Sequence, residues 1–480
     1  MAGTYSRTTQ VLIIGGGPGG YVAAIRLGQL GKKALLVERS ELGGECLNRG
    51  CIPSKALIHA SILYRQVTQE GPEIGVVAEA ARFDLERAQK WKESVVSKER
   101  QGVATLLKAA GCSVLRGEAR FTGPLSAELT APDGGRERID FEQAILATGA
   151  YHVSLPGFEP DGRSVFTSEQ ILELRAVPRS IVVLGGGVSG CELGEFLARV
   201  GVHVTIVELL PQLLPGLEVD LSQELTQVLE KLGVTVLTGT RATRLDRKSE
   251  AIALTVEGPN GVATLEGEKL FLTVGKKPDT RGLALEEAGV NVDPKTGFVT
   301  VNDRQQTSAQ NVYAVGDVCR PPMLAHKAYR EGTVAAETIA GMPTRFQFQA
   351  MPSVVFTTPE LATVGLTLTE ARAKGYAARE VRFPFAALGR AHAAHATWGW
   401  MKIVGDDTTG LLLGTHAAGE SSGEFVAEAA HAIEMGSTVR DLALTIHPHP
   451  TFSESLGEAA LLWLGEPMHV TKRAGDVRSR

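Results

Sequence analysis

The sequence contains one internal repeat, and this repeat constrains the fold more than any other feature. Residues 11–20 and 181–190 match at an offset of 170 positions, and each is an apolar run of strand length that leads into the pattern G-x-G-x-x-G. A helix-forming stretch follows, and then a second apolar run that ends in an acid, Glu38 or Glu208. Each copy is therefore a βαβ unit, and the pair predicts an α/β fold with doubly wound domains.

The glycine spacing indicates a dinucleotide site in each unit. The three glycines allow a tight turn, let the backbone approach a pyrophosphate, and let the helix pack on the strand. They are Gly15, Gly17 and Gly20 in the first unit and Gly185, Gly187 and Gly190 in the second. The pyrophosphate lies at the helix N-terminus, where unpaired N–H groups favour an anion. The alternative is two glycine-rich turns that bind no nucleotide.

The two acids refine the prediction. Glu38 and Glu208 each follow the third glycine by 18 residues, where a carboxylate accepts hydrogen bonds from ribose hydroxyls. Glu208 would also repel a 2′-phosphate, so NAD is favoured over NADP at the second site. Two dinucleotide sites in one chain predict a pair of redox cofactors that exchange electrons.

Length and charge exclude several classes of protein. The 480 residues predict roughly three domains at about 150 residues each. The net charge of −5 argues against a nucleic-acid partner and a polybasic membrane anchor. Residues 1–10 lack the apolar segment of a signal peptide, and no apolar stretch reaches the length of a membrane span. With only 5 cysteines, we expect a cytoplasmic, reducing environment.

Cys46 and Cys51 are the one closely spaced cysteine pair. Positions five apart lie about one and a half turns apart along a helix, so a bond between them requires a distorted first turn. Gly50 and Pro53 suit such a distortion. A zinc site would need more ligands, and no second Cys or Cys/His pair with zinc spacing occurs in the sequence, so no metal is expected. A structural disulfide across so short a loop would add little stability. A redox-active dithiol is favoured, with two buried thiols as the alternative.

The segment 43–55 resembles the active-site signature of the class I pyridine nucleotide–disulfide oxidoreductases. Further matches lie at residues 147–149, 274–275, 277–278, 313–317, 323–328 and 447–454, so the resemblance covers nearly the whole chain. Three departures are Glu45 in place of the usual threonine, Lys276-Lys277 in place of an arginine pair, and Tyr329-Arg330 in place of an acidic pair. Only Glu45 is near the chemistry, where it bears on redox tuning.

The resemblance implies two Rossmann-like doubly wound domains and a C-terminal α/β dimerisation domain. Its parts are an FAD-binding domain over 1–150, an NAD-binding domain over 151–275, a central return to the FAD domain over 276–346, and an interface domain over 347–480. In the last of these, strands are expected at 353–356 and 401–404.

The resemblance also implies where the cofactors FAD and NAD bind. Asp317 would hydrogen-bond the ribityl chain of the flavin, and Ala325 with His326 would lie along its ring system. The implied cofactor-binding residues are Gly15, Gly17, Pro18, Gly20, Glu38, Arg39, Gly44, Lys55, Ala119, Thr148, Gly149, Asp317, Leu324, Ala325, His326, Gly185, Gly187, Val188, Gly190, Glu192, Glu208, Ala242 and Gly275.

The implied catalytic residues are Cys46, Cys51, Lys55, Glu192, His449 and Glu454. Lys55, paired with Glu192, would stabilise negative charge on the reduced flavin. His449 would be the base, oriented by Glu454, while His447 is less suited to that role. His392, His395 and His416 are expected to be structural. In the family the His–Glu pair comes from the other subunit, which implies a homodimer.

The implied reaction is oxidation of protein-bound dihydrolipoamide through the Cys46–Cys51 disulfide and FAD, with reduction of NAD⁺ to NADH. The chain has no lipoyl domain, so the partner is a lipoyl-bearing acyltransferase (E2) or the glycine cleavage H protein. One alternative is another disulfide reductase of the family, although a glutathione reductase would need cations in place of Glu208. The other alternative is a non-catalytic complex subunit, against which the intact cysteine and histidine residues speak.

Overall fold

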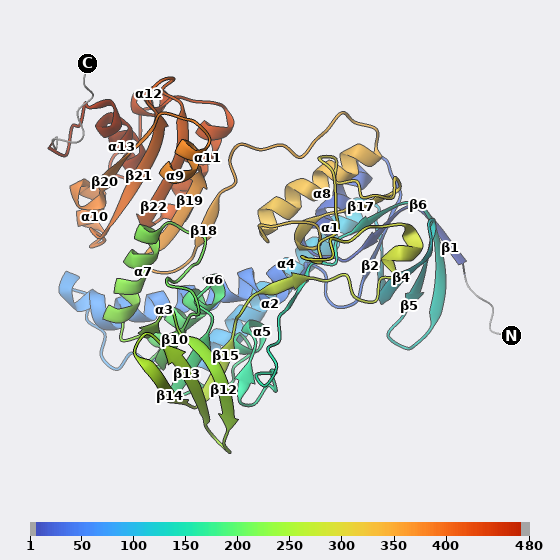
Figure 1. The fold of residues 1–480 in the computed structure, drawn as a ribbon, viewed down its shortest axis with the longest axis horizontal. Coiled ribbons are helices and arrows are strands. Elements are labelled where there is room, and N and C mark those ends of the chain that lie inside the picture. The colour runs from blue at the N-terminus through green and yellow to red at the C-terminus, as the bar shows by residue number, and fades with distance from the viewer. Residues whose placement is uncertain (1–5, 472–480) are drawn as a thin grey trace. The chain divides into compact units, whose positions relative to one another are not determined.

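Both predicted βαβ units form, and they lie in different parts of the molecule (Figure 1). The structure is a computed structural model that describes residues 6–471. The described residues form two compact units. The first comprises the chain up to Arg179 with Leu245–Ala253 and Glu266–Gln347, and the second comprises Ser180–Arg244, Leu254–Leu265 and the chain from Phe348 onward. Residues 472–480, a polar and basic stretch of the sequence, lie outside the described residues.

The helices and strands have the following bounds. The helices are α1 Pro18–Gln29, α2 Gly44–Arg49, α3 Cys51–Arg65, α4 Leu85–Ala109, α5 Ser168–Ile171, α6 Val188–Arg199, α7 Val219–Lys231, α8 Ala325–Ile339, α9 Leu368–Ala373, α10 Gly389–Ala393, α11 Ser422–Glu434, α12 Val439–Leu444 and α13 Glu454–Leu464. Short helical segments are η1 Gln66–Glu70, η2 Gly71–Ile74, η3 Leu285–Ala288, η4 Gly316–Val318 and η5 Phe385–Ala387. The strands are β1 Ser6–Ile14, β2 Ala34–Glu38, β3 Ser113–Arg116, β4 Glu118–Gly123, β5 Ser126–Thr130, β6 Arg136–Leu146, β7 Ala150–His152, β8 Val165–Phe166, β9 Ser180–Leu184, β10 His203–Val207, β11 Thr235–Leu237, β12 Arg241–Arg247, β13 Ile252–Gly258, β14 Gly261–Gly267, β15 Lys269–Leu272, β16 Lys276–Pro278, β17 Val312–Ala314, β18 Ser353–Val355, β19 Glu360–Gly365, β20 Ala378–Pro384, β21 Gly399–Asp406 and β22 Leu412–Gly419.

A seven-stranded sheet organises the first unit. Its order is β3-β2-β1-β6-β5-β4, and β17 also pairs with β6. The strands β3, β2, β1, β6 and β17 are parallel, whereas β4 and β5 are antiparallel additions. Side chains of β1 alternate between two cores: Val11 and Ile13 pack with α1 residues, and Leu12 and Ile14 pack with residues of β4 and β5. Since both faces of the strand are buried, an unbroken apolar run is what its sequence requires.

The second unit contains the other βαβ repeat and an antiparallel sheet. The strands β9, β10 and β11 are parallel. The C-terminal sheet has the order β18-β19-β22-β21-β20, and its β18 and β21 confirm the two strands expected from the sequence. Helices α11 and α13 cover it with an apolar core.

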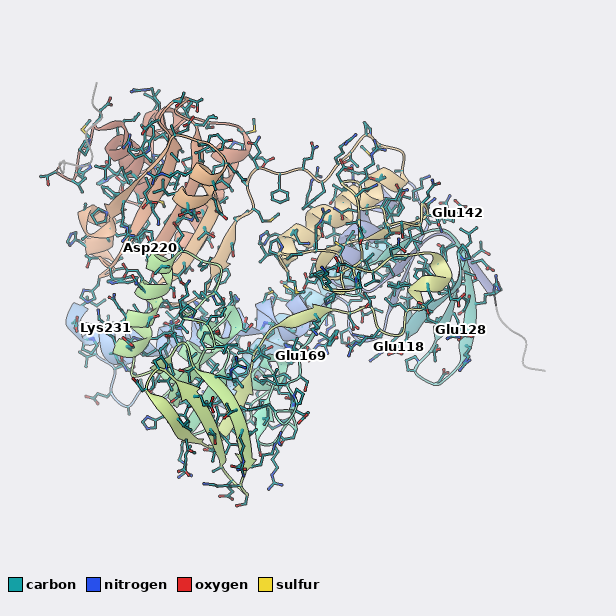
Figure 2. All side chains as sticks on the ribbon, viewed as in Figure 1. Glu118, Glu128, Glu142, Glu169, Asp220 and Lys231 are labelled. Carbon is teal, nitrogen blue, oxygen red and sulfur yellow. The ribbon has the colours of Figure 1, made fainter. Side chains whose placement is uncertain are left out.

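A buried cation joins α7 to this sheet within the second unit. Lys402 on β21 is almost fully buried, and its ammonium lies 2.7 Å from Asp220, which is labelled on α7 in Figure 2, and 2.8 Å from Glu218. Trp400 donates its indole N–H to Glu224 at 3.0 Å. A buried ammonium is stable only with such partners, so these contacts fix the helix against the sheet.

No helix among the described residues is both long enough and apolar enough to cross a membrane.

Candidate functional site

The first glycine fingerprint forms the tight turn that its sequence predicts. Gly15 has a φ of +107°, and a Cβ there would lie 2.3 Å from the Ala147 carbonyl oxygen. A Cβ on Gly20 would lie 1.9 Å from the carbonyl oxygen of Gly15, so α1 packs directly on the turn. At Gly17, by contrast, the nearest atom to a Cβ is the Gly44 Cα at 3.8 Å. This open approach at the N-terminus of α1, next to Pro18, fits the pyrophosphate of a dinucleotide.

The second fingerprint repeats this geometry at the N-terminus of α6. Gly185 has a φ of +114°, and no heavy atom of the described residues lies within 4 Å of a Cβ built on Gly187. Val188 begins α6 and is exposed, and Gly190 lies buried in its first turn. The second site therefore also has room for a dinucleotide backbone.

The two acids make equivalent hydrogen bonds. Glu38 accepts from the N–H of Gly16 at 2.6 Å and of Ser40 at 2.7 Å. Glu208 accepts from the N–H of Gly186 at 2.6 Å and of Leu210 at 2.7 Å. Because backbone donors hold each carboxylate at the end of its strand, both acids are fixed beside the glycine turn.

Ala119, another of the predicted cofactor-binding residues, lies buried on β4. Gly117 lies just before this strand, and its N–H donates to the carbonyl oxygen of Glu38.

Asp279 gathers three of the predicted cofactor-binding residues of the first unit. Arg39 contacts its carboxylate at 2.8 Å, and the Thr148 hydroxyl donates to its carbonyl oxygen at 2.7 Å. The N–H of Asp279 donates to the carbonyl of Gly149 at 2.9 Å. Arg39 and Arg281 lower the pKa of this carboxyl although burial alone would raise it. No pattern in the sequence links Asp279 to these residues, because they are distant from it in the chain.

The central segment brings further predicted residues to this unit. Asp317 lies in η4, where burial raises its pKa although Lys276 and Lys327 act in the opposite direction. Leu324 precedes α8, which begins with Ala325 and His326. A Cβ on Gly332 of α8 would lie 2.4 Å from the Gly19 carbonyl, so α8 packs tightly on α1. This packing places η4 and α8 beside the first fingerprint.

The cysteine pair lies at a break between two helices. Cys46 is in α2 and Cys51 is the first residue of α3, while Gly50 between them has φ −135° and ψ −106°. The distortion expected near the pair is therefore a complete helix break at Gly50. Asn48 stabilises it by donating to the carbonyl oxygens of Leu42 at 2.9 Å and Gly44 at 2.8 Å.

The two sulfurs are close to the distance of a disulfide bond, and the structure has both as thiols. The hydrogen bond with Cys51 and burial raise the pKa of the Cys46 thiol, while the charge of Lys55, one turn along α3, acts to lower it. Two sulfurs this close can pass between the dithiol and the disulfide, as thiol–disulfide exchange requires.

The other three cysteines are in environments that suppress reactivity. Burial raises the pKa of Cys112 to about 11 and that of Cys319 to about 12, and the pKa of the fully buried Cys191 is raised as well. Cys46 and Cys51 differ from these three in lying near the distance of a disulfide bond, so this pair is the one suited to reversible disulfide formation.

The sequence did not reveal the environment of Glu45. Its carboxylate contacts the Lys276 ammonium and lies 3.8 Å from Nε2 of His152, which is also 3.8 Å from Glu169, labelled in Figure 2. These three side chains have metal-ligand chemistry, but Lys276 and Arg49 already supply two cations. We interpret the group as an ion-pair network. The only signal in the sequence was that Glu45 and Lys276 both depart from the family pattern.

His449 and Glu454 form a dyad in the second unit. His449 Nδ1 lies 2.8 Å from Glu454, and the side chain of His449 is 74% exposed. Partial burial alone would raise the pKa of Glu454, but the Thr451 N–H and the His449 ring lower it. The Glu454 carboxylate, which accepts the Thr451 N–H, orients the ring, and no hydrogen-bond partner of Nε2 is found among the described residues. An exposed, oriented imidazole of this kind is suited to acid–base catalysis.

The remaining predicted residues have the following surroundings. Glu192 is buried on α6 and accepts the N–H of Phe356 at 2.9 Å. Ala242 lies on β12, and Gly275 accepts the N–H of Val153 at 3.0 Å. His416 is buried, and burial lowers its pKa, as expected for a structural histidine.

Comparisons with known proteins extend over the same elements. A family model described as "Pyridine nucleotide-disulphide oxidoreductase" matches residues 9–332, and the model of its dimerisation domain matches residues 351–460. A dihydrolipoyl dehydrogenase of Thermus scotoductus is 45% identical over 470 residues, covering 97% of this chain and 100% of the relative. One from Geobacillus stearothermophilus is 40% identical and covers 98% and 99%.

Two solved structures are also similar to this chain over nearly its whole length. LpdA from Mycobacterium tuberculosis has a TM-score of 0.88 at 27% identity and covers 94% of this chain and 99% of that one. A Cu(II) complex of the HOCl-induced flavoprotein disulfide reductase RclA from Escherichia coli has a TM-score of 0.85 at 28% identity, covering 95% and 99%. The similarity therefore includes both fingerprints, the cysteine pair and the His449 segment.

Proposed function

Since the chain belongs to the pyridine nucleotide–disulphide oxidoreductases, we propose that it oxidises a dihydrolipoyl group carried by another protein and reduces NAD⁺, the reaction of a dihydrolipoamide dehydrogenase. The observation that carries this proposal is the Cys46–Cys51 dithiol at a helix break beside the first fingerprint. We also propose the predicted division into FAD-binding, NAD-binding, central and interface domains at residues 150, 275 and 346, and a cytoplasmic location.

The two fingerprints fit the family's cofactors, FAD and NAD(H). In the proposed assignment, Gly15, Gly17 and Gly20 hold the pyrophosphate of FAD, and the corresponding glycines of α6 hold that of NAD. Glu38 and Glu208 accept ribose hydroxyls. When bound, FAD supplies a two-electron carrier between the cysteine pair and NAD⁺. Lys55 and Glu192 remain the proposed charge pair beside the flavin.

The substrate's electrons enter at the disulfide. His449 takes the proton from one dihydrolipoyl thiol, and the thiolate attacks the Cys46 sulfur while Cys51 leaves as a thiolate. The second substrate thiol then displaces Cys46, which leaves with the remaining proton. The lipoyl group departs as a cyclic disulfide, and both cysteines are left reduced.

We further propose that each site in the homodimer takes its His449–Glu454 dyad from the other subunit. The matched dimerisation domain supports a homodimer. The segment before the dyad presents two apolar side chains, Leu444 at 72% and Ile446 at 96% exposed, which suits a surface that a second copy covers. The lipoyl-bearing partner is proposed to be an E2 acyltransferase or the glycine cleavage H protein.

Substitution of the two cysteines tests the proposed chemistry. We expect Cys46→Ser and Cys51→Ser to abolish NAD⁺ reduction by dihydrolipoamide while the purified proteins stay yellow. Cys112→Ser is the matched control and is expected to keep normal turnover, because that thiol is held protonated. Full activity of either active-site variant would disprove the mechanism.

A substrate panel separates the alternatives. Activity with dihydrolipoamide and NAD⁺, but not with glutathione disulfide and NADPH, is expected. The reverse preference would indicate another disulfide reductase, and no turnover with either pair would indicate a non-catalytic subunit.

A further inference from the structure

His447 occupies a different environment from His449, although only one residue separates them. Its side chain is 8% exposed, whereas that of His449 is 74% exposed. Nε2 of His447 lies 3.0 Å from Glu428 on α11, and Nδ1 lies 3.1 Å from the carbonyl oxygen of Thr445. Both ring nitrogens are therefore engaged, so His447 is not available as a base.

The two partners also determine the charge of this ring. A carboxylate and a carbonyl oxygen can only accept hydrogen bonds, so each nitrogen of His447 must carry a hydrogen to satisfy them. Both bonds exist together only in the imidazolium form. The hydrogen bond to Glu428 raises the pKa of His447 despite its partial burial, with Thr445 and the nearby Glu454 acting in the same direction.

The ring also packs against α13. A Cβ on Gly457 would lie 2.9 Å from Nδ1 and 3.0 Å from Cε1 of His447. The segment 445–453 is thus anchored to α11 and α13 on one side of His449. On the other side, Thr451 anchors it by donating its N–H to Glu454 at 2.7 Å and its hydroxyl to the Pro448 carbonyl at 2.7 Å.

We propose that His447 is a positioning residue whose ion pair with Glu428, together with its packing on Gly457, fixes the loop that presents His449 to the reacting thiol. This role rests on the proposed function, since it matters only if His449 is the base. Small displacements are costly: a shift of about 1 Å in a catalytic group can reduce turnover about 100-fold. Lys, Arg or Ala at position 447 would each leave Glu428 or the Gly457 surface without a fitting partner.

Two amide substitutions separate the contacts of the ring. The amide nitrogen of His447→Gln corresponds to Nε2 and can still reach Glu428, whereas that of His447→Asn corresponds to Nδ1 and can reach only Thr445. We expect kcat for dihydrolipoamide to fall roughly 100-fold in His447→Asn and only a few-fold in His447→Gln, with KM for NAD⁺ unchanged in both. Glu428→Gln keeps an oxygen that can accept from Nε2, so its kcat should fall mainly where His447 loses its proton.

The control is another histidine–glutamate pair, whose glutamate lies on α13, the helix against which His447 packs. His469 Nδ1 lies 2.8 Å from Glu458 of α13, but His469 is mostly exposed and distant in the sequence from the base. We expect His469→Gln to keep normal kcat. Equal losses in His469→Gln and His447→Asn would overturn the proposal, because any disturbance of α13 would then suffice.

The pH profile distinguishes positioning from simple stabilisation. Because the folded-state pKa of His447 is raised above its ordinary value of 6.5, the anchor is complete below pH 6.5 and is lost as the pH rises through the raised pKa. Glu428→Gln removes the main cause of the shift, so its alkaline loss of kcat should begin at lower pH than in the wild type. An unchanged profile would disprove the role.

A second measurement keeps this inference separate from the proposed function. Hydrogen exchange at the Thr451 amide, which donates to Glu454, should accelerate at least about tenfold in His447→Asn. Failure of the wild type to oxidise dihydrolipoamide would refute the proposed function but leave this result interpretable. Unchanged exchange with unchanged kcat would refute the anchor, and NADH oxidation by an artificial quinone, which needs no thiol base, should be unaffected in every variant.

Discussion

His449 and Glu454 form one acid–base pair, and substitutions at the two positions separate the proton acceptor from the charge that supports it. His449→Gln removes the base, so we expect kcat with dihydrolipoamide to fall by about 100- to 10,000-fold. Glu454→Gln keeps an oxygen for the Thr451 N–H but loses the negative charge beside the ring, so a smaller loss of about 10- to 100-fold is expected.

The control for this pair is NADH oxidation by an artificial quinone, which should continue at the wild-type rate in both variants. Near-normal lipoamide turnover in His449→Gln would rule out its role as the base. The lowered pKa of Glu454 adds a pH effect: its contribution to stability is complete above its ordinary value of 4.5 and is lost as the pH falls through the lowered pKa.

Single residues differ in how far the sequence reveals them. The spacing of Cys46 and Cys51 indicates their chemistry, whereas His449 is indicated by the resemblance of residues 447–454 to the family motif. Asp279 and Glu428 act through contacts with residues far away in the chain, and no local pattern marks them. Glu45 is intermediate, because its unusual charge is visible in the sequence while its partner Lys276 is known only from the fold.

At the scale of elements, both βαβ units are predictable from the sequence, because the tight turn, the approach to the pyrophosphate and the helix packing each require a glycine at a fixed position. The match extends from the turn to the acids: Glu38 accepts the N–H of Gly16 and Glu208 accepts that of Gly186, each at 2.6 Å. The break at Gly50 was predicted less completely. The cysteine spacing, with Gly50 and Pro53, indicates a distorted first turn. The division into α2 and α3 depends on tertiary contacts such as the hydrogen bond from the Arg100 side chain to the Asn48 side chain at 2.9 Å.

The N-terminus of α6 offers a test of the second dinucleotide site. A Cβ on Gly187 meets no described atom within 4 Å, so Gly187→Ala should leave the melting temperature nearly unchanged. The methyl group would instead occupy the approach that the pyrophosphate needs, so we expect KM for NAD⁺ to rise at least about tenfold. Steady-state kinetics and thermal unfolding together check both halves of this expectation.

Gly194 is the matched control within the same helix. Its Cβ would make ordinary contacts, the nearest at 3.5 Å to Ile206, and alanine favours a helix interior. Gly194→Ala should therefore keep the KM for NAD⁺. If Gly187→Ala also kept it, α6 would not bind the cofactor as proposed.

At the scale of the whole molecule, the sequence predicted the α/β class and the sheet of the C-terminal domain, but not how segments group. Residues 180–244 and 254–265 pack in one compact unit with the chain from Phe348 onward. The ion pairs of Lys402 with Glu218 and Asp220 explain part of this grouping. Their partners are more than 150 positions apart in the chain, beyond the range of any sequence pattern.

Mixed dimers test whether the site is shared between subunits. Cys46→Ser and His449→Gln are each expected to be inactive, since one lacks the electrophilic sulfur and the other the base. If the base acts in trans, a dimer with one subunit of each kind contains one intact site, built from the cysteines of the His449→Gln chain and the histidine of the Cys46→Ser chain. Random mixing gives half mixed dimers, so about a quarter of wild-type activity should return.

If the base acted within its own subunit, both sites of every mixed dimer would be defective and no activity would return. The double variant mixed with itself is the control, and it should stay inactive after the same unfolding and refolding.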